Sequence, residues 1–115
     1  MRSLSAPTDI LGDLCRVLET RKTAEPGASY VAALYAKGTD AILKKIGEEA
    51  AETLIAAKNP DDAQLIHELA DLWFHTLVLM AQRGLPLERL TGELARRFGT
   101  SGHAEKAART KDETR

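Results

Sequence analysis

The sequence predicts an all-α protein, a helical bundle of four to five helices. Alanine and leucine are plentiful and aromatic residues make up only 4% of the chain, a composition that favours helix. Apolar residues recur at three- and four-residue spacing, and no segment shows the alternation of a strand. The 115 residues suffice for one domain with a real core. We therefore expect a single domain over residues 1–115, with its core at about 9–98 and a polar C-terminal tail at 99–115.

The first part of the chain predicts two helices with clear start and stop signals. Thr8 or Asp9 can cap a helix that runs to about Thr23, before the breaker Glu25-Pro26-Gly27. Ser29 can cap a short helix over residues 30–37 that ends at Gly38. One apolar stripe marks the buried side of the first helix: Ile10, Leu11, Leu14, Val17 and Leu18.

Two longer helices and a shorter one follow. Thr39 or Asp40 can cap the third helix, to about Lys58, and Asp61 or Asp62 starts the fourth, to about Arg83. Gly84 ends the fourth helix, and Pro86 suits the first turn of a fifth, to about Phe98. The apolar arc of the third helix comprises Ile42, Leu43, Ile46 and Leu54, and that of the fourth comprises Leu65, Leu69, Leu72, Trp73, Thr76, Leu77 and Met80. The second arc is wider than one small neighbour covers, so we expect a homo-oligomer, most simply a dimer.

Five carboxylates lie at the edges of these two arcs. Glu48, Glu49 and Glu52 fall within roughly 100° of one helix, and Glu68 and Asp71 are one turn apart on the next. If the helices pack side by side, these like charges converge and disfavour joint ionisation. A hard divalent cation with oxygen ligands usually resolves such a conflict. The alternative is a solvated helix face, but no basic residues follow the acids at the stabilising spacing.

Lys45 lies on the acidic face, one turn before Glu48 and Glu49. It either forms a weak surface ion pair or meets the phosphate oxygens of a metal-bound ligand. His75 follows Asp71 by four residues, and could support a ligand, carry a proton or simply pack against a neighbour. The sequence contains no histidine pair spaced for zinc and no glycine-rich phosphate loop.

Charge and cysteine content narrow the class of protein further. The net charge of -1 gives no global attraction to nucleic acid or to an anionic membrane. A single cysteine, Cys15, cannot form an internal disulfide, which fits a reducing compartment. There is no run of about 18 apolar residues and no apolar signal core at the N-terminus. We expect a cytoplasmic protein without nucleic-acid or membrane partners.

The acidic pattern resembles a known signature. Glu-Glu-x-x-Glu at residues 48–52, followed by Glu-x-x-Asp at 68–71, is similar to the motif of the all-α nucleoside-triphosphate pyrophosphatases, the MazG-like superfamily. Within it, the chain closely resembles the phosphoribosyl-ATP pyrophosphohydrolases (diphosphatases) of histidine biosynthesis, over roughly residues 9–109. The matching pieces are Arg21-Lys22 with Pro26, Ser29-Tyr30, Lys44 to Ala50, Glu68 to Leu72 with His75, and Ser101 to Lys106.

This resemblance implies a hydrolase that converts phosphoribosyl-ATP to phosphoribosyl-AMP and pyrophosphate, the second step of histidine biosynthesis. It also implies magnesium, with manganese as a substitute, and a helical oligomer, commonly a dimer, with sites near the subunit interface. Two alternatives stay open: a house-cleaning nucleoside-triphosphate pyrophosphatase, and a non-enzymatic helical interaction module whose acids serve solubility.

The hypothetical mechanism assigns the metal to all five carboxylates: Glu48, Glu49, Glu52, Glu68 and Asp71. A water attacks the α-phosphorus, oriented by Glu48 or Glu49, between which the sequence does not choose. Lys45 is expected to contact phosphate. The candidates for the 5′-phosphate of the ribosyl group are Arg21, Lys106 and Arg109.

Overall fold

The computed structural model describes residues 9–99, which form five α-helices and two short 3-10 turns, with no strand among them. The predicted all-α fold is confirmed. The chain divides into two compact units, one that ends at Leu85 and one that begins at Pro86. The single domain over residues 1–115 stays a prediction. No helix within residues 9–99 is long and apolar enough to cross a membrane.

The first unit begins with α1 (Ile10–Thr20), the 3-10 turns η2 (Arg21–Thr23) and η3 (Pro26–Ala28), and α2 (Tyr30–Lys37). The first helix was expected to reach Thr23, but its last turn tightens into η2. The Ser29 hydroxyl accepts a hydrogen bond from the Ala32 N–H at 3.0 Å, so the predicted cap of α2 is confirmed. Asp9 lies at the start of α1, but its side chain makes no capping hydrogen bond.

Gly38 links α2 to α3 (Thr39–Ala57). Its φ of 98° lies in the left-handed region, which glycine adopts without steric cost. This conformation lets the Gly38 N–H reach the carbonyls of the α2 C-terminus while α3 starts at the next residue. The prediction that Thr39 or Asp40 caps α3 was therefore wrong. Thr39 is already helical, and its hydroxyl donates to the Gln82 side chain at 3.0 Å.

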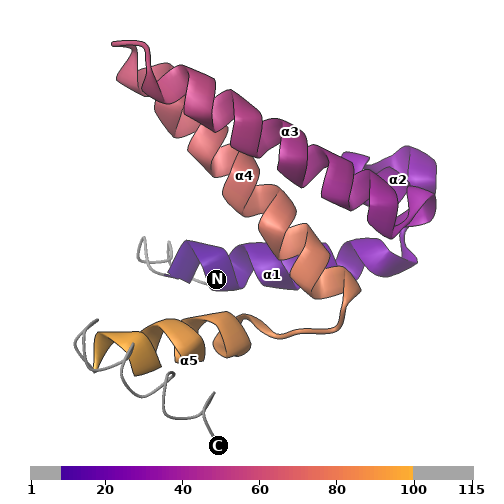
Figure 1. The fold of residues 1–115 in the computed structure, drawn as a ribbon. Helices are drawn as coiled ribbons and strands as arrows, with labels where there is room; N and C mark the ends of the chain where they lie inside the picture. The colour runs from indigo at the N-terminus through magenta and orange to yellow at the C-terminus, as the bar shows by residue number, and fades with distance from the viewer. Residues whose placement is uncertain (1–8, 100–115) are drawn as a thin grey trace, which may run out of the picture. The chain divides into compact units, whose positions relative to one another are not determined.

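The second long helix, α4 (Asp62–Gln82), returns alongside α3 after a short turn, so the two form an antiparallel hairpin (Figure 1). Asp61 caps it as predicted, because its carboxylate accepts hydrogen bonds from the N–H groups of Ala63 and Gln64 at 3.1 and 3.3 Å. Gly84, with φ 70°, follows its end. In Figure 1, α1 crosses α4 and α2 lies near the start of α3.

The core forms where α1 and α2 cover the hairpin. The buried apolar residues are Leu18, Val31, Ala32, Leu34, Ile42, Ala56, Leu77, Val78 and Ala81. Five residues of the predicted apolar stripe and arcs are instead exposed: Ile10 and Val17 on α1, Leu43 and Leu54 on α3, and Trp73 on α4, with Leu54 at 71% and Trp73 at 58%. At these positions the neighbouring helices of the described residues leave much of the side chain uncovered, which explains the difference.

The second unit contains α5 (Leu87–Phe98). Pro86 occupies the cap position just before the helix rather than its first turn, one residue earlier than expected. On this helix the Glu93 carboxylate accepts hydrogen bonds from Arg96 and Arg97, three and four residues later.

Candidate metal and triphosphate site

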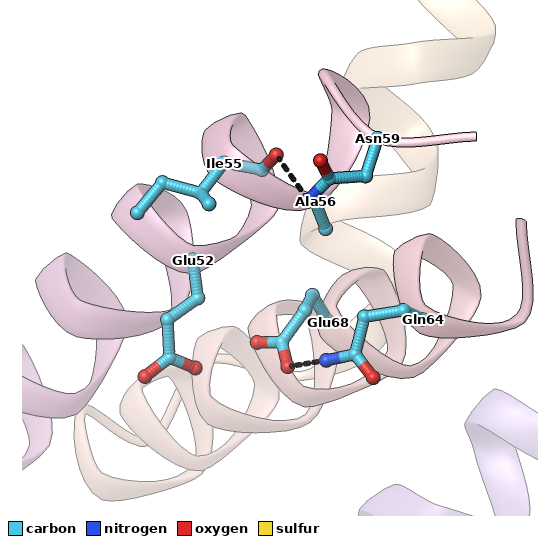
Figure 2. A pocket seen from close by; sticks show the side chains of 6 residues that line it. All are labelled: Glu52, Ile55, Ala56, Asn59, Gln64 and Glu68. Carbon is cyan, nitrogen blue, oxygen red and sulfur yellow. Dashed lines mark hydrogen bonds between the residues drawn. The ribbon is translucent and has the colours of Figure 1, made fainter. Parts of the chain in front are cut away.

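The α3–α4 hairpin brings together Glu49, Glu52 and Glu68. One carboxylate oxygen of each lies within 4.8 Å of the others. Glu49 and Glu52 are three residues apart on α3 and so share a face. Figure 2 shows Glu52 reaching from α3 toward Glu68 on α4. The convergence predicted from the sequence therefore exists for these three residues.

Asp71 also lies close to Glu68, in a second set of possible ligand atoms. His67, Glu68 and Asp71 form a second set in which one ligand atom of each lies within 4.8 Å of the others. The His67 Nε2 lies 3.3 Å from the Asp71 Oδ2. We call Glu49, Glu52, Glu68 and Asp71 the carboxylate cluster. Glu48, predicted as a fifth ligand, is exposed on α3 and belongs to neither set.

Two members of the carboxylate cluster are buried. Glu49 is 5% exposed and Glu68 is 6% exposed, and the Oε2 atom of each is buried without a hydrogen-bond partner. Buried polar atoms are nearly always paired, because leaving one unpaired costs its full desolvation energy. An oxygen-only donor set with unpaired buried oxygens matches the requirements of a hard divalent cation.

The pKa values of Glu49, Glu52 and Glu68 show that these close carboxyl groups disfavour one another's ionisation. Contact with the Glu52 carboxylate, where a shared proton can form a hydrogen bond, raises the pKa of Glu68 to about 7, with further contributions from burial and from the charges of Glu52 and Glu49. Burial, followed by Glu52, raises the pKa of Glu49. Contact with Glu68 and Glu49 lowers the pKa of Glu52. The raised pKa values of Glu68 and Glu49 show that protonation of these two carboxyl groups is favoured when no cation is bound, because close carboxylates disfavour joint ionisation.

Among residues 9–99, Lys45 brings an ammonium group to the carboxylate cluster. The Lys45 Nζ lies 3.7 Å from the Glu49 Oε1. Burial lowers the pKa of Lys45, but nearby Tyr30, Glu48, Glu49 and Glu52 raise it more, so the net shift is upward and the ammonium stays charged. This positive charge alone does not balance the four carboxylates of the cluster.

A cavity of about 390 Å³ opens beside the cluster. Figure 2 shows its six lining residues: Glu52, Ile55, Ala56, Asn59, Gln64 and Glu68. The Gln64 side-chain amide donates a hydrogen bond to the Glu68 Oε1 at 2.9 Å. This bond holds one oxygen of Glu68, whereas the other, Oε2, is buried and has no hydrogen-bond partner.

Comparison with known proteins identifies the family. The sequence profile described as "Phosphoribosyl-ATP pyrophosphohydrolase" matches residues 11–98. The chain is similar to two proteins named phosphoribosyl-ATP pyrophosphatase. The one from Hydrogenovibrio crunogenus is 54% identical over 91% of this chain and 96% of its own length. The one from Methylococcus capsulatus is 57% identical over 88% of this chain and 96% of its own length. A third, in Vesicomyosocius okutanii, is 54% identical over 88% of this chain and 96% of its own length.

The chain belongs to the phosphoribosyl-ATP pyrophosphohydrolase family. The region matched by this family profile includes the carboxylate cluster, Glu48, Lys45 and Arg21. Arg21 lies exposed in η2 and belongs to neither set of clustered ligand atoms. Lys106 and Arg109, the other two candidates for the ribosyl phosphate, lie outside the described residues.

The sequence analysis did not predict every residue that lies beside the carboxylate cluster. Gln64 and His67 each precede a cluster member by four residues, so the helical spacing to Glu68 and Asp71 could have found them. Tyr30 bonds to His75 across 45 positions, and no local signal predicts that pairing. His75 is only 4% exposed and packs against Phe74. This matches the third interpretation given above, a histidine that packs against a neighbour.

Proposed function

We propose that this chain hydrolyses phosphoribosyl-ATP to phosphoribosyl-AMP and pyrophosphate, the second step of histidine biosynthesis. The observation that carries the proposal is the buried carboxylate cluster with its two unpaired oxygens, in a chain that belongs to this family. The names and identity of the three relatives support the same enzyme class, a hydrolase of a phosphoric anhydride bond.

The metal in this proposal is magnesium, with manganese as a substitute. Glu49, Glu52, Glu68 and Asp71 would hold it, and the all-carboxylate set of Glu49, Glu52 and Glu68 supports a hard cation. When bound, the metal offsets the negative charge on the phosphoryl oxygens. Lys45 lies beside the Glu49 carboxylate and would bind the triphosphate as a second positive charge.

Hydrolysis requires a water molecule to attack the α-phosphorus while the bond between the α-phosphorus and the bridging oxygen breaks. Glu49 belongs to the clustered ligand atoms, whereas the exposed Glu48 does not. We therefore assign Glu48 the role of orienting the water, by accepting one of its hydrogen bonds. The candidates for binding the 5′-phosphate of the ribosyl group remain those predicted from the sequence: Arg21, Lys106 and Arg109.

We also propose a cytoplasmic dimer. Leu54, Ile55, Ile66 and Trp73 are each more than half exposed on the α3–α4 hairpin. Several large apolar side chains exposed on one pair of helices are typical of a surface that a second subunit covers. Light scattering at micromolar concentration tests this proposal, and a monomer would contradict it.

The function is tested by pyrophosphate release from phosphoribosyl-ATP and from a panel of ordinary nucleoside triphosphates, with and without magnesium. We expect magnesium-dependent release that strongly favours phosphoribosyl-ATP. Faster hydrolysis of an ordinary triphosphate would point to the house-cleaning class. Absence of turnover together with no effect of magnesium on melting would point to an interaction module.

Glu48 and Glu52 form a matched pair for the assignment of roles. Glu48→Gln should lower kcat by about 100-fold, as the loss of a general base does, while magnesium still raises the melting temperature. Glu52→Gln should lose both turnover and the magnesium-dependent rise in melting temperature. If Glu48→Gln also abolished the rise, Glu48 would be a metal ligand, as the sequence first suggested.

A further inference from the structure

His67 brings a nitrogen donor to one end of the carboxylate cluster. Its Nε2 atom lies 3.3 Å from the Oδ2 of Asp71, four residues later on α4. One ligand atom each of His67, Glu68 and Asp71 lies within 4.8 Å of the others. Metal–ligand bonds of about 2.0–2.2 Å place the ligand atoms of one ion roughly 3 to 4 Å apart. The three side chains are therefore close to the spacing that a single cation requires.

The alternative is an ordinary surface contact between His67 and Asp71. Their side chains are 65% and 40% exposed, and exposed ion pairs on one helix contribute little. Glu68 distinguishes this pair from such a contact. It is 6% exposed, and its Oε2 is buried without a hydrogen-bond partner among the described residues. An unpaired buried oxygen costs its desolvation energy until a ligand reaches it, so the set contains one member that needs a ligand.

The set of His67, Glu68 and Asp71 is buried on one side and open on the other. Exposure increases from Glu68 through Asp71 to His67. Gln64 fixes the buried member, because its amide donates to the Glu68 Oε1 at 2.9 Å. A cation with three protein ligands at such a place keeps open positions for water or for the oxygens of a substrate. This is the arrangement of a metal that acts on a bound molecule.

The donor atoms differ between the two ends of the cluster. Glu49, Glu52 and Glu68 offer oxygen alone, whereas His67 adds an imidazole nitrogen to Glu68 and Asp71. Magnesium takes oxygen ligands and keeps several waters, so it gains little from an imidazole. First-row transition-metal ions accept imidazole readily, and their affinity for mixed nitrogen and oxygen sites rises from Mn²⁺ through Co²⁺ to Ni²⁺.

We propose that His67 is a nitrogen ligand of the divalent cation at Glu68 and Asp71, and that it makes this end of the carboxylate cluster favour a first-row transition-metal ion over magnesium. The inference rests on the metal site of the proposed function and adds the class of ion that the site selects. It does not involve the substrate, so the metal ion alone is the probe.

The first test is calorimetric titration of the metal-free protein with Co²⁺ and with Mg²⁺, at one fixed pH. In His67→Ala, the affinity for Co²⁺ should fall by about tenfold or more, at least the scale on which loss of an outer partner weakens a metal site. The affinity for Mg²⁺ should barely change. The readout is the ratio of the two affinities, because oxygen ligands alone already bind Co²⁺ to some extent.

Two further variants control this titration. His67→Glu replaces the nitrogen donor with a carboxylate oxygen, so it should bind Mg²⁺ more tightly than the wild type and lower the ratio of Co²⁺ to Mg²⁺ affinity. Arg16→Ala removes a comparably exposed partner, since Arg16 pairs with Asp13 on α1 and belongs to neither set of ligand atoms. Its affinities should equal those of the wild type. An unchanged affinity ratio in His67→Ala would overturn the proposal.

The second test needs no variant. Pulsed electron paramagnetic resonance of Mn²⁺ bound to the wild type should show coupling to a directly bound nitrogen, and this coupling should disappear in His67→Ala. Absence of the coupling from the wild type, or its persistence in His67→Ala, would overturn the assignment. A wild type that hydrolyses phosphoribosyl-ATP with magnesium but shows no nitrogen coupling refutes this inference alone. A wild type that shows the coupling but does not hydrolyse phosphoribosyl-ATP refutes the proposed function alone.

Discussion

Glu68 on α4 and Glu93 on α5 are the same residue in the same secondary structure, yet their carboxyl groups have pKa values of about 7 and about 2. Contact with the Glu52 carboxylate, then burial, raises the first. Hydrogen bonds from Arg96 and Arg97 lower the second. The two glutamates differ in what faces them, acids from a neighbouring helix in one case and bases from the same helix in the other, and in exposure, since Glu68 is buried and Glu93 is not.

The difference separates a structural glutamate from a functional one. The negative charge of Glu93 is balanced by Arg96 and Arg97 on its own helix, so it does not need a bound cation. Glu68 has an unpaired buried oxygen and acidic neighbours, an arrangement that costs stability until a cation arrives. Strongly perturbed carboxyl groups of the second kind are common at functional sites.

The largest expected effect comes from Glu68→Gln. Gln keeps the shape and removes one charged ligand, so metal-dependent turnover should fall by about 100-fold or more. The metal-free protein should keep or gain melting temperature, because repulsion within the carboxylate cluster decreases. Melting curves with and without magnesium, beside a pyrophosphate-release assay, check both statements. A variant that is less stable yet fully active would show that Glu68 is a structural residue.

Gln64→Leu should have an intermediate effect. It removes the hydrogen bond that orients Glu68 and leaves every carboxylate of the cluster in place. Loss of such an outer partner lowers metal affinity by about tenfold or more. Magnesium titration of the melting temperature measures this shift. Asn59→Leu is a matched control, because Asn59 lines the same cavity but its side-chain amide hydrogen-bonds to the Ile55 backbone, at 3.5 Å, and to no carboxylate of the described residues. Equal affinities in the two variants would contradict a role for Gln64.

The pH dependence of stability should have opposite signs in the two regions. The pKa of Glu68 is raised, so the native state binds more protons than the unfolded state, and its contribution is lost as pH rises from about 4.5 to about 7. The pKa of Glu93 is lowered, so its contribution is lost as pH falls from about 4.5 to about 2. Melting of the metal-free protein across pH 4 to 8 should therefore show a decrease in stability toward neutral pH.

Two controls sharpen that experiment. Glu68→Gln should flatten the decrease, since the titrating group is gone. Magnesium should reverse it, because ligands must lose their protons to bind metal. A profile that is the same for the wild type and for Glu68→Gln would assign the decrease to other groups.

The smallest effect is expected from Glu93→Gln, the same substitution in the other region. Exposed ion pairs within one helix contribute little to stability. Turnover and magnesium-dependent melting should match the wild type, and the melting temperature at neutral pH should barely change. A large loss of turnover in this variant would show that α5 takes part in the site.

Much of the fold could be predicted because its signals are local. Ser29 and Asp61 cap their helices as expected, since a side chain bonds to an N–H two or three residues away. Gly38 was assigned only to the end of α2, although its positive φ also lets α3 start at once. Leu54 and Trp73 were expected on buried arcs but are exposed, because periodicity marks an apolar face without saying whether a neighbour covers it.

The sequence by itself determined the helices, the acidic faces on α3 and α4 and the resemblance to a pyrophosphohydrolase family, because all three depend on residue types at fixed spacing. The tertiary structure decided which acids meet. It places Glu49, Glu52, Glu68 and Asp71 in the clustered sets, leaves Glu48 outside them, and buries the unpaired oxygens of Glu49 and Glu68. It also pairs Tyr30 with His75, which are 45 positions apart. Such contacts depend on how two helices rotate and slide against each other, and the spacing within either helix does not fix that.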